Sequence, residues 1–142
     1  MQAWVYTTLA GDATLTTLLG GSGRVYERHA VPASASTYVL FEIQMPEYVR
    51  VVRRGQGRIM TSGELVVRAV GPAVRPGAVS FTAIESIIQR CETLLDGPAP
   101  STNSYGSVLA CQALMPLPPT TTPIEGGLLV PEVGTVYEVA CQ

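Results

Sequence analysis

Residues 80–95, SFTAIESIIQRCETLL, decide how the rest of the chain has to pack. Apolar side chains recur in this stretch at every third or fourth position: Phe81, Ile84, Ile87, Ile88, Cys91, Leu94 and Leu95. The opposite side of a helix would be polar: Glu85, Gln89, Arg90 and Glu92. This spacing predicts an amphipathic α-helix that lays its apolar stripe on a larger apolar surface. We expect Ser80 to cap its start, and Gly97 with Pro98 to end it.

The larger surface is predicted to be a β-sheet, because segments on both sides of the helix alternate apolar and polar residues. Strands are expected at 24–28, 37–45, 48–54, 64–70, 108–114 and 135–141. Most of them follow one another without a helix between them, which implies largely antiparallel pairing. The predicted fold class is therefore α+β, with an N-terminal helix and the central amphipathic helix packed on one face of the sheet. A chain of 142 residues fits one domain, 1–142.

Residues 2–19 predict an N-terminal helix in two pieces. Apolar residues have helical spacing in each piece: Trp4, Val5 and Leu9, then Leu15, Leu18 and Leu19. Gly11 is expected to end the first piece, and Asp12 is a favourable N-cap for the second. The glycine-rich run 20–23 then stops the helix and connects it to the first strand.

Two segments are expected to leave the sheet. Pro46 interrupts the strand pattern, and Gly55-Gln56-Gly57 offers a turn, so residues 46–63 predict a projecting hairpin. Several prolines, a threonine run and a glycine pair fill residues 115–134, which predicts a long irregular loop. Loops of that length in compact domains are usually functional or mobile.

The composition favours a protein that binds other subunits. Only 14% of the residues are charged, against about 25% in an average soluble domain. Stable interfaces are depleted of charge at their centres, although a less polar monomer would have the same composition. No apolar run approaches the ~20 residues that cross a bilayer, and the N-terminus lacks signal-peptide features, so assembly in the cytoplasm is expected. The three cysteines, which are Cys91, Cys111 and Cys141, have neither disulfide nor zinc spacing and are interpreted as small buried apolar residues.

No group of residues predicts catalysis. His29 is the only histidine, and no cysteine or serine lies at a recognisable spacing from it. The run 20–24 lacks the lysine of a phosphate-binding loop and follows a predicted helix rather than a strand. Glu42 and Glu138 are expected on exposed strand faces, but no sequence spacing pairs them, and no metal-ligand spacing is present. We therefore expect a protein that is not an enzyme and that binds no cofactor and no metal.

Four of the nine basic residues lie close together in the predicted hairpin: Arg50, Arg53, Arg54 and Arg58. They are the candidate protein-interface residues, since arginine pairs well with carboxylates and phosphates. The alternative is a solvated edge hairpin whose charges discourage aggregation. Four guanidinium groups this close together repel one another, so we expect these arginines to contact carboxylates of a neighbouring subunit.

The N-terminal third of the chain contains an ordered set of short motifs. Residues 9–20 read LAGDATLTTLLG, Arg24-Val25-Tyr26 follows, and Pro32 precedes a strand that opens on Tyr38-Val39-Leu40-Phe41. Across residues 9–41 this order resembles the siphophage tail-terminator, or tail-completion (head–tail joining), family. Members of that family begin with a helix of pattern Leu-x-x-Asp-x-x-Leu-x-x-Leu-Leu-Gly, followed by Arg-Val-Tyr, a proline and a Tyr-Val strand. The later helix at 80–95 and the terminal strand with Tyr137 follow the family's order more loosely.

The resemblance implies a structural virion protein without catalytic activity. It implies a hexameric, ring-forming subunit that caps the tail tube and joins it to the head connector. The implied partners are further copies of the chain, the tail tube protein and a head-side connector or stopper protein, with DNA only in transit through the lumen and no membrane. The implied location is the tail or neck of the virion, assembled in the host cytoplasm.

Two other functions stay open from the sequence. The first is another neck component, such as a head-completion or stopper protein, which would differ in its position among the stacked neighbours of the neck. The second is a small cytosolic ligand-binding or enzyme domain. A concave, polar-lined cavity near His29 would favour that second function.

Overall fold

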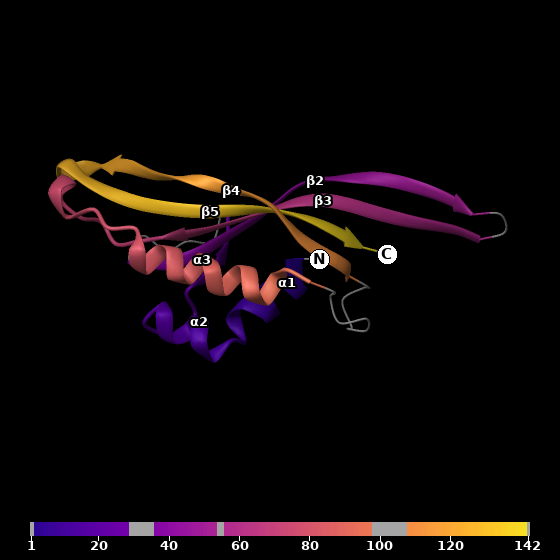
Figure 1. Ribbon diagram of the computed structural model, residues 1–142, viewed down its shortest axis with the longest axis horizontal. Helices are drawn as coiled ribbons and strands as arrows, with labels where there is room; N and C mark the ends of the chain where they lie inside the picture. The colour runs from indigo at the N-terminus through magenta and orange to yellow at the C-terminus, as the bar shows by residue number, and fades with distance from the viewer. Residues whose placement is uncertain (1, 29–35, 54–55, 98–107, 142) are drawn as a thin grey trace.

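The structure of the protein is a computed structural model that describes residues 2–28, 36–53, 56–97 and 108–141. Three helices lie on one face of a five-stranded sheet (Figure 1). The helices are α1 (Gln2–Ala10), α2 (Ala13–Leu18) and α3 (Thr82–Leu95). The strands are β1 (Val25–Glu27), β2 (Tyr38–Arg53), β3 (Gln56–Val70), β4 (Val108–Ile124) and β5 (Leu128–Cys141), with short 3-10 turns at Pro76–Ala78 and Glu125–Gly127.

The strand order is β1-β2-β3-β5-β4. Only β1 and β2 run parallel, and the other three pairs are antiparallel, which confirms the predicted α+β class. Among the described residues, no helix is long and apolar enough to cross a membrane.

The two-piece N-terminal helix is confirmed. Asp12 caps α2, because its Oδ1 accepts a hydrogen bond of 2.6 Å from the amide of Leu15. The same carboxylate accepts two hydrogen bonds from Arg90 of α3, at 3.1 and 2.6 Å. The Arg90 guanidinium and the Leu15 amide lower the pKa of Asp12 below its ordinary value. One prediction here was wrong: Leu18 is 41% exposed and does not join the buried stripe.

Helix α3 buries the predicted stripe, with Ile84, Ile87, Ile88, Cys91 and Leu95 in the core. Its start differs from the prediction. The N-cap residue is Phe81, which makes no side-chain cap hydrogen bond, rather than Ser80. Phe81 packs against the core, so apolar burial rather than a hydroxyl cap fixes the entry into the helix.

The predicted break at Pro46 is a bulge inside one long strand. β2 continues from Tyr38 to Arg53, and its register with β3 shifts between Gln44 and Glu47. A bulge removes Pro46 from the hydrogen-bonding ladder, where its missing N–H would otherwise leave a gap.

The predicted loop at 115–134 was wrong, because these residues extend β4 and β5 into a second ribbon. Pro116 pairs with Thr135 and Pro123 with Leu129, while Pro118 and Pro119 fall in a register shift between Leu117 and Thr120. Strand β4 is an edge strand of the sheet. A proline in an edge strand interrupts no hydrogen bonds with a second neighbouring strand. Gly126 and Gly127 turn the ribbon with φ of 82° and 70°, a conformation that glycine adopts without strain.

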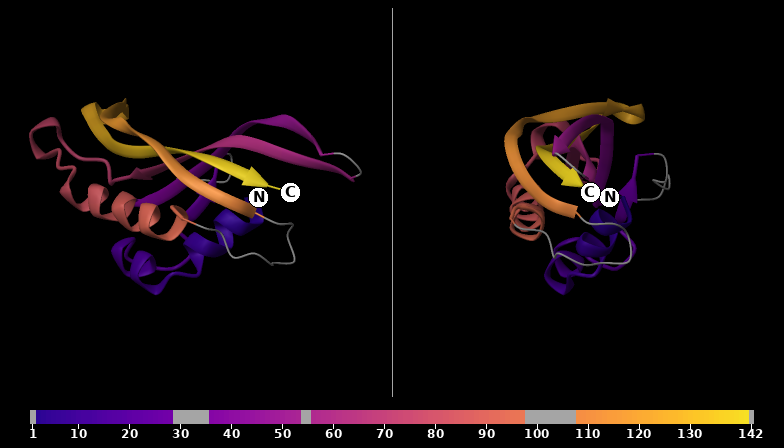
Figure 2. Two further views of the ribbon diagram at one scale, coloured as in Figure 1. Left: turned by 45° about the vertical axis from the view of Figure 1, so that its right-hand side comes forward. Right: turned by 90° about the vertical axis from the view of Figure 1, so that its right-hand side faces the viewer.

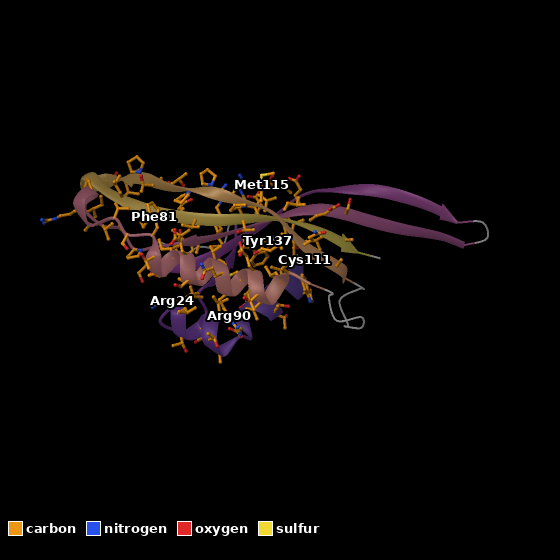
Figure 3. All side chains as sticks on the ribbon, in the orientation of Figure 1. Arg24, Phe81, Arg90, Cys111, Met115 and Tyr137 are labelled. Atoms are coloured by element: carbon orange, nitrogen blue, oxygen red, sulfur yellow. The ribbon has the colours of Figure 1, made fainter. Side chains whose placement is uncertain are left out.

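The core lies between the helices and the inner face of the sheet. Its strand residues alternate along each strand, and include Val39 and Phe41 of β2, Leu65, Val67 and Ala69 of β3, and Tyr137 and Val139 of β5. Figure 3 shows Tyr137 between the sheet and α3. We call this side of the sheet the inner face and the opposite side the outer face.

Candidate interaction surfaces

The basic hairpin, defined as residues 46–63, is formed by β2 and β3 and projects beyond the helices (Figures 1 and 2). The ladder between β3 and β5 ends at Thr61 paired with Cys141. Farther out, from Val49 paired with Met60 to Arg53 paired with Gln56, the two strands pair only with each other among the described residues. A two-stranded ribbon is marginally stable by itself in water. Its two free edges are therefore available to a partner.

The candidate arginines come from both strands of this hairpin. Arg50 pairs with Ile59, whereas Arg58 pairs with Val51 and Arg53 pairs with Gln56. Arg54 lies outside the described residues.

The second ribbon projects toward the opposite end of the molecule (Figure 1). Its strands, Thr121–Ile124 and Leu128–Pro131, pair with each other beyond the last β3–β5 pair at Val70 and Glu132. Backbone hydrogen bonds tie it to the body at two points: Val74 and Leu129 exchange two of them, at 2.9 and 2.8 Å, and the Gly71 amide donates one of 2.9 Å to the Pro131 carbonyl. Ile124 near its tip is 43% exposed, which gives the ribbon an apolar contact surface.

The outer face of the sheet carries two adjacent rows of residues across four strands. The acidic row consists of exposed polar residues: Gln44, Glu64, Glu138 and Gln112. The next row is mostly apolar: Glu42, Val66, Val136 and Met115. Figure 3 shows Met115 on the side of the sheet away from the helices, and its side chain is 57% exposed. None of the described helices covers these two rows (Figure 1), but neighbouring side chains bury Val66, which is 7% exposed.

The charges on the outer face are only partly matched. Glu42 pairs with Arg28, and Glu132 pairs with Arg68 at 3.4 Å. Glu64 and Glu138 are direct register partners, and neither appears in an ion pair within the described part of the chain. Sequence reasoning missed this pair, because 74 positions separate the two residues and only the strand register brings them together.

A shallow groove of about 410 Å³ lies where α1 meets the edge strand β1. Tyr6, Val25, Tyr26 and Phe41 give it a mainly apolar and aromatic lining, and Glu27 is its one carboxylate. The Glu27 carboxylate accepts a hydrogen bond of 2.8 Å from Gln2.

The residues considered for chemistry are scattered. His29 lies outside the described residues, and the glycine-rich run 20–23 joins α2 to β1. Burial raises the pKa of the Cys91 thiol to about 12, so it stays protonated at neutral pH. Cys111 is also buried, and the side chain of Cys141 is not among those described. In the ranges that the structure covers, no three His, Cys, Asp or Glu side chains are grouped so that they could hold a metal ion.

The sequence matches no protein-family model and no curated protein. Its fold is similar to that of a chain in a solved structure described as the virion of a native gene transfer agent (GTA) particle. The TM-score is 0.68 with 19% sequence identity, and the alignment covers 99% of this chain and 93% of that chain. At this identity the likeness establishes a shared fold over nearly the whole length of both chains.

Proposed function

We propose that the protein is a non-enzymatic structural component of a phage-like virion. In this proposal it caps the tail tube as a hexameric ring and joins the tube to the head connector, without a cofactor. The observation that carries the proposal is the fold likeness to a chain of the gene transfer agent virion, which spans nearly the whole chain. The resemblance of residues 9–41 to tail-terminator proteins selects this role among the structural roles in a virion.

The distribution of charge supports assembly from identical copies. The basic hairpin carries four arginines and one glutamate, whereas the rest of the chain carries five arginines and ten carboxylates. One end of each copy is therefore positive and the remainder is negative. Such a molecule associates head to tail, and a head-to-tail contact leaves no open end only when the copies close into a ring.

The two ribbons support the same arrangement, because they project from opposite ends of the body (Figure 2). Each has strand edges without a ladder partner among the described residues. A neighbouring copy on each side would supply the missing contacts.

The proposal is tested with particles of the virus that encodes the chain. Deleting the gene should leave filled heads and separate tails, which electron microscopy would count. Purified protein added back should bind isolated tails at one end and restore joining. Binding to isolated heads instead would identify a stopper or head-completion protein, and intact infectious particles without the protein would refute the virion role.

A further inference from the structure

A bulge in the edge strand β4 carries the two most exposed large apolar side chains among the described residues. Leu114 is 48% exposed and Met115 is 57% exposed (Figure 3). The register with β5 shifts between Ala113 and Met115, so that Leu114 and Met115 together oppose the single residue Val136. Bulges at sheet edges aim side chains away from the regular pleat. We call Leu114 and Met115 the apolar knob.

The apolar knob offers side chains rather than backbone to a partner. Pro116, Pro118 and Pro119 follow it along the same edge strand, and each lacks an amide donor. A strand from another molecule therefore cannot form a regular ladder along this edge past the knob. Exposed apolar side chains at such a position are typical of a contact with a concave apolar surface.

The groove between α1 and β1 matches the apolar knob in size and chemistry. Its volume is about 410 Å³, and a cavity the size of one truncated core side chain is about 150 Å³, so the groove has room for two apolar side chains. Tyr6, which is 47% exposed, and Tyr26 contribute aromatic rings, against which methionine sulfur packs favourably. Glu27 already accepts a hydrogen bond from Gln2, so an apolar occupant leaves this carboxylate partnered.

The apolar knob of one copy cannot reach the groove of the same copy. Strand β4 forms one edge of the sheet and β1 forms the other. Four strand spacings separate them, which corresponds to about 19 Å at roughly 4.8 Å per spacing. The knob that fills this groove therefore has to come from a second molecule.

The charges beside the apolar knob and beside the groove are complementary. Arg28 follows β1, and its side chain is 58% exposed even though it pairs with Glu42 on the outer face. Glu138 of β5 is exposed on the outer face one row from Met115, and it appears in no ion pair within the described ranges. When two sheets stand edge to edge with their outer faces on the same side, Arg28 of one copy lies near Glu138 of the other.

Resting on the proposed ring, we infer that the apolar knob of one copy inserts into the groove between α1 and β1 of the next copy. Leu114 and Met115 then cover the tyrosine rings of the groove, and Arg28 of the receiving copy faces Glu138 of the copy that supplies the knob. The two surfaces are different and lie at opposite edges of the sheet. Repetition of this contact by rotation about one axis therefore closes a ring.

A charge placed in either half of the contact tests the inference. Met115→Glu in the knob and Tyr6→Glu in the groove should each weaken ring assembly by at least about tenfold, because each would bury a carboxylate in an apolar contact. Leu18→Glu is the matched control, since Leu18 is 41% exposed on α2 outside both surfaces, and it should assemble normally. Native mass spectrometry measures assembly under conditions in which the unmodified protein forms rings. Circular dichroism verifies that every variant is folded.

Crosslinking identifies the two surfaces that meet. In rings of the double variant Tyr6→Cys with Met115→Cys, a short bismaleimide should join neighbouring copies into a ladder that ends at the closed ring. The double variant Leu18→Cys with Met115→Cys is the control and should give no such ladder. Each single substitution to cysteine measures the background from the three native cysteines.

The outcomes separate the inference from the proposed function. If the unmodified chain forms rings but either glutamate variant assembles normally, or if the Tyr6–Met115 pair crosslinks no better than the control, the inference is wrong while the proposed function stands. If Met115→Glu forms normal rings that no longer bind isolated tails, the knob binds a tail protein, and the inference is again wrong. If the unmodified chain forms no ring, even with tail tubes present, both are wrong.

Discussion

The inner face of the sheet and the basic hairpin are built from the same two strands, β2 and β3, but have different surroundings. On the inner face, Leu65, Val67 and Ala69 are fully buried under the helices. Beyond the pair Thr61–Cys141, the hairpin strands pair only with each other among the described residues and extend past every described helix (Figure 1). The comparison indicates that folding stability comes from the body, whereas the projecting strands contribute contacts that only a partner completes.

The two faces of β3 show the same contrast within a single strand. Leu65 and Val67 lie in the core, while Glu64 and Arg68, their neighbours in sequence, are exposed on the outer face. A subunit that worked alone would gain little from an outer face with an unmatched glutamate pair beside an exposed methionine.

The largest effect is expected from truncating a side chain in the core. Ile87 of α3 is 1% exposed, so Ile87→Ala should lower the free energy of unfolding by about 2–5 kcal/mol through lost burial and a residual cavity. The matched variant Ile124→Ala, in the second ribbon, removes a side chain that is 43% exposed and should change it by less than about 0.5 kcal/mol. Urea unfolding of the subunit measures both, and equal losses would contradict the division between body and ribbon.

An intermediate effect is expected where α2 meets α3. Asp12→Ala removes the N-cap of α2 and the partner of Arg90, and a lost cap alone typically costs about 0.5–2 kcal/mol. Asp12→Asn keeps an oxygen that can accept from the Leu15 amide, so its loss should be smaller. Comparing the two variants by chemical unfolding at neutral pH separates the cap from the ion pair.

The same carboxylate predicts a dependence on pH. Arg90 and the Leu15 amide lower the pKa of Asp12 in the folded state, so ionised Asp12 stabilises the fold fully above its unfolded pKa of about 4. That contribution is lost as the pH falls from about 4 through the lower folded pKa. Unfolding midpoints of the unmodified protein should therefore drop more steeply in this range than those of Asp12→Asn. Identical acid profiles would show that the Asp12 charge contributes nothing.

The parts of the fold that could be predicted from sequence are those whose pattern lies in neighbouring residues. The spacing of α3 and the pair Gly11-Asp12 are local, and the structure confirms both. The strand at 115–124 was missed because its prolines indicate a loop unless the strand lies at a sheet edge, which is a property of the whole fold. Pro46 was misjudged for a related reason, since the bulge that accommodates it depends on the pairing with β3.

Of the candidate interaction surfaces, only the arginine cluster could be predicted from the sequence. The arginine cluster is contiguous in sequence, so composition revealed it, but the pairing of its members across the hairpin follows from the register of β2 with β3. The paired Glu64 and Glu138 come from β3 and β5 and have no signal in sequence spacing. Surfaces formed by register across strands become visible only when the sheet order is known.

The smallest effect is expected from removing the buried hydroxyl group of Tyr137 in the core. The Tyr137 ring is fully buried, and its hydroxyl is buried without a hydrogen-bond partner among the described residues. Burial raises the pKa of this phenol, so it stays neutral at any ordinary pH. A buried hydroxyl without a partner keeps its desolvation cost, so Tyr137→Phe should leave the free energy of unfolding unchanged or raise it by up to about 1 kcal/mol. Ile87→Ala is the reference for a costly change in the same core. If Tyr137→Phe instead destabilises the protein by more than about 1 kcal/mol in urea unfolding, the hydroxyl is hydrogen-bonded in solution. The core then contains no buried hydroxyl without a partner at this position.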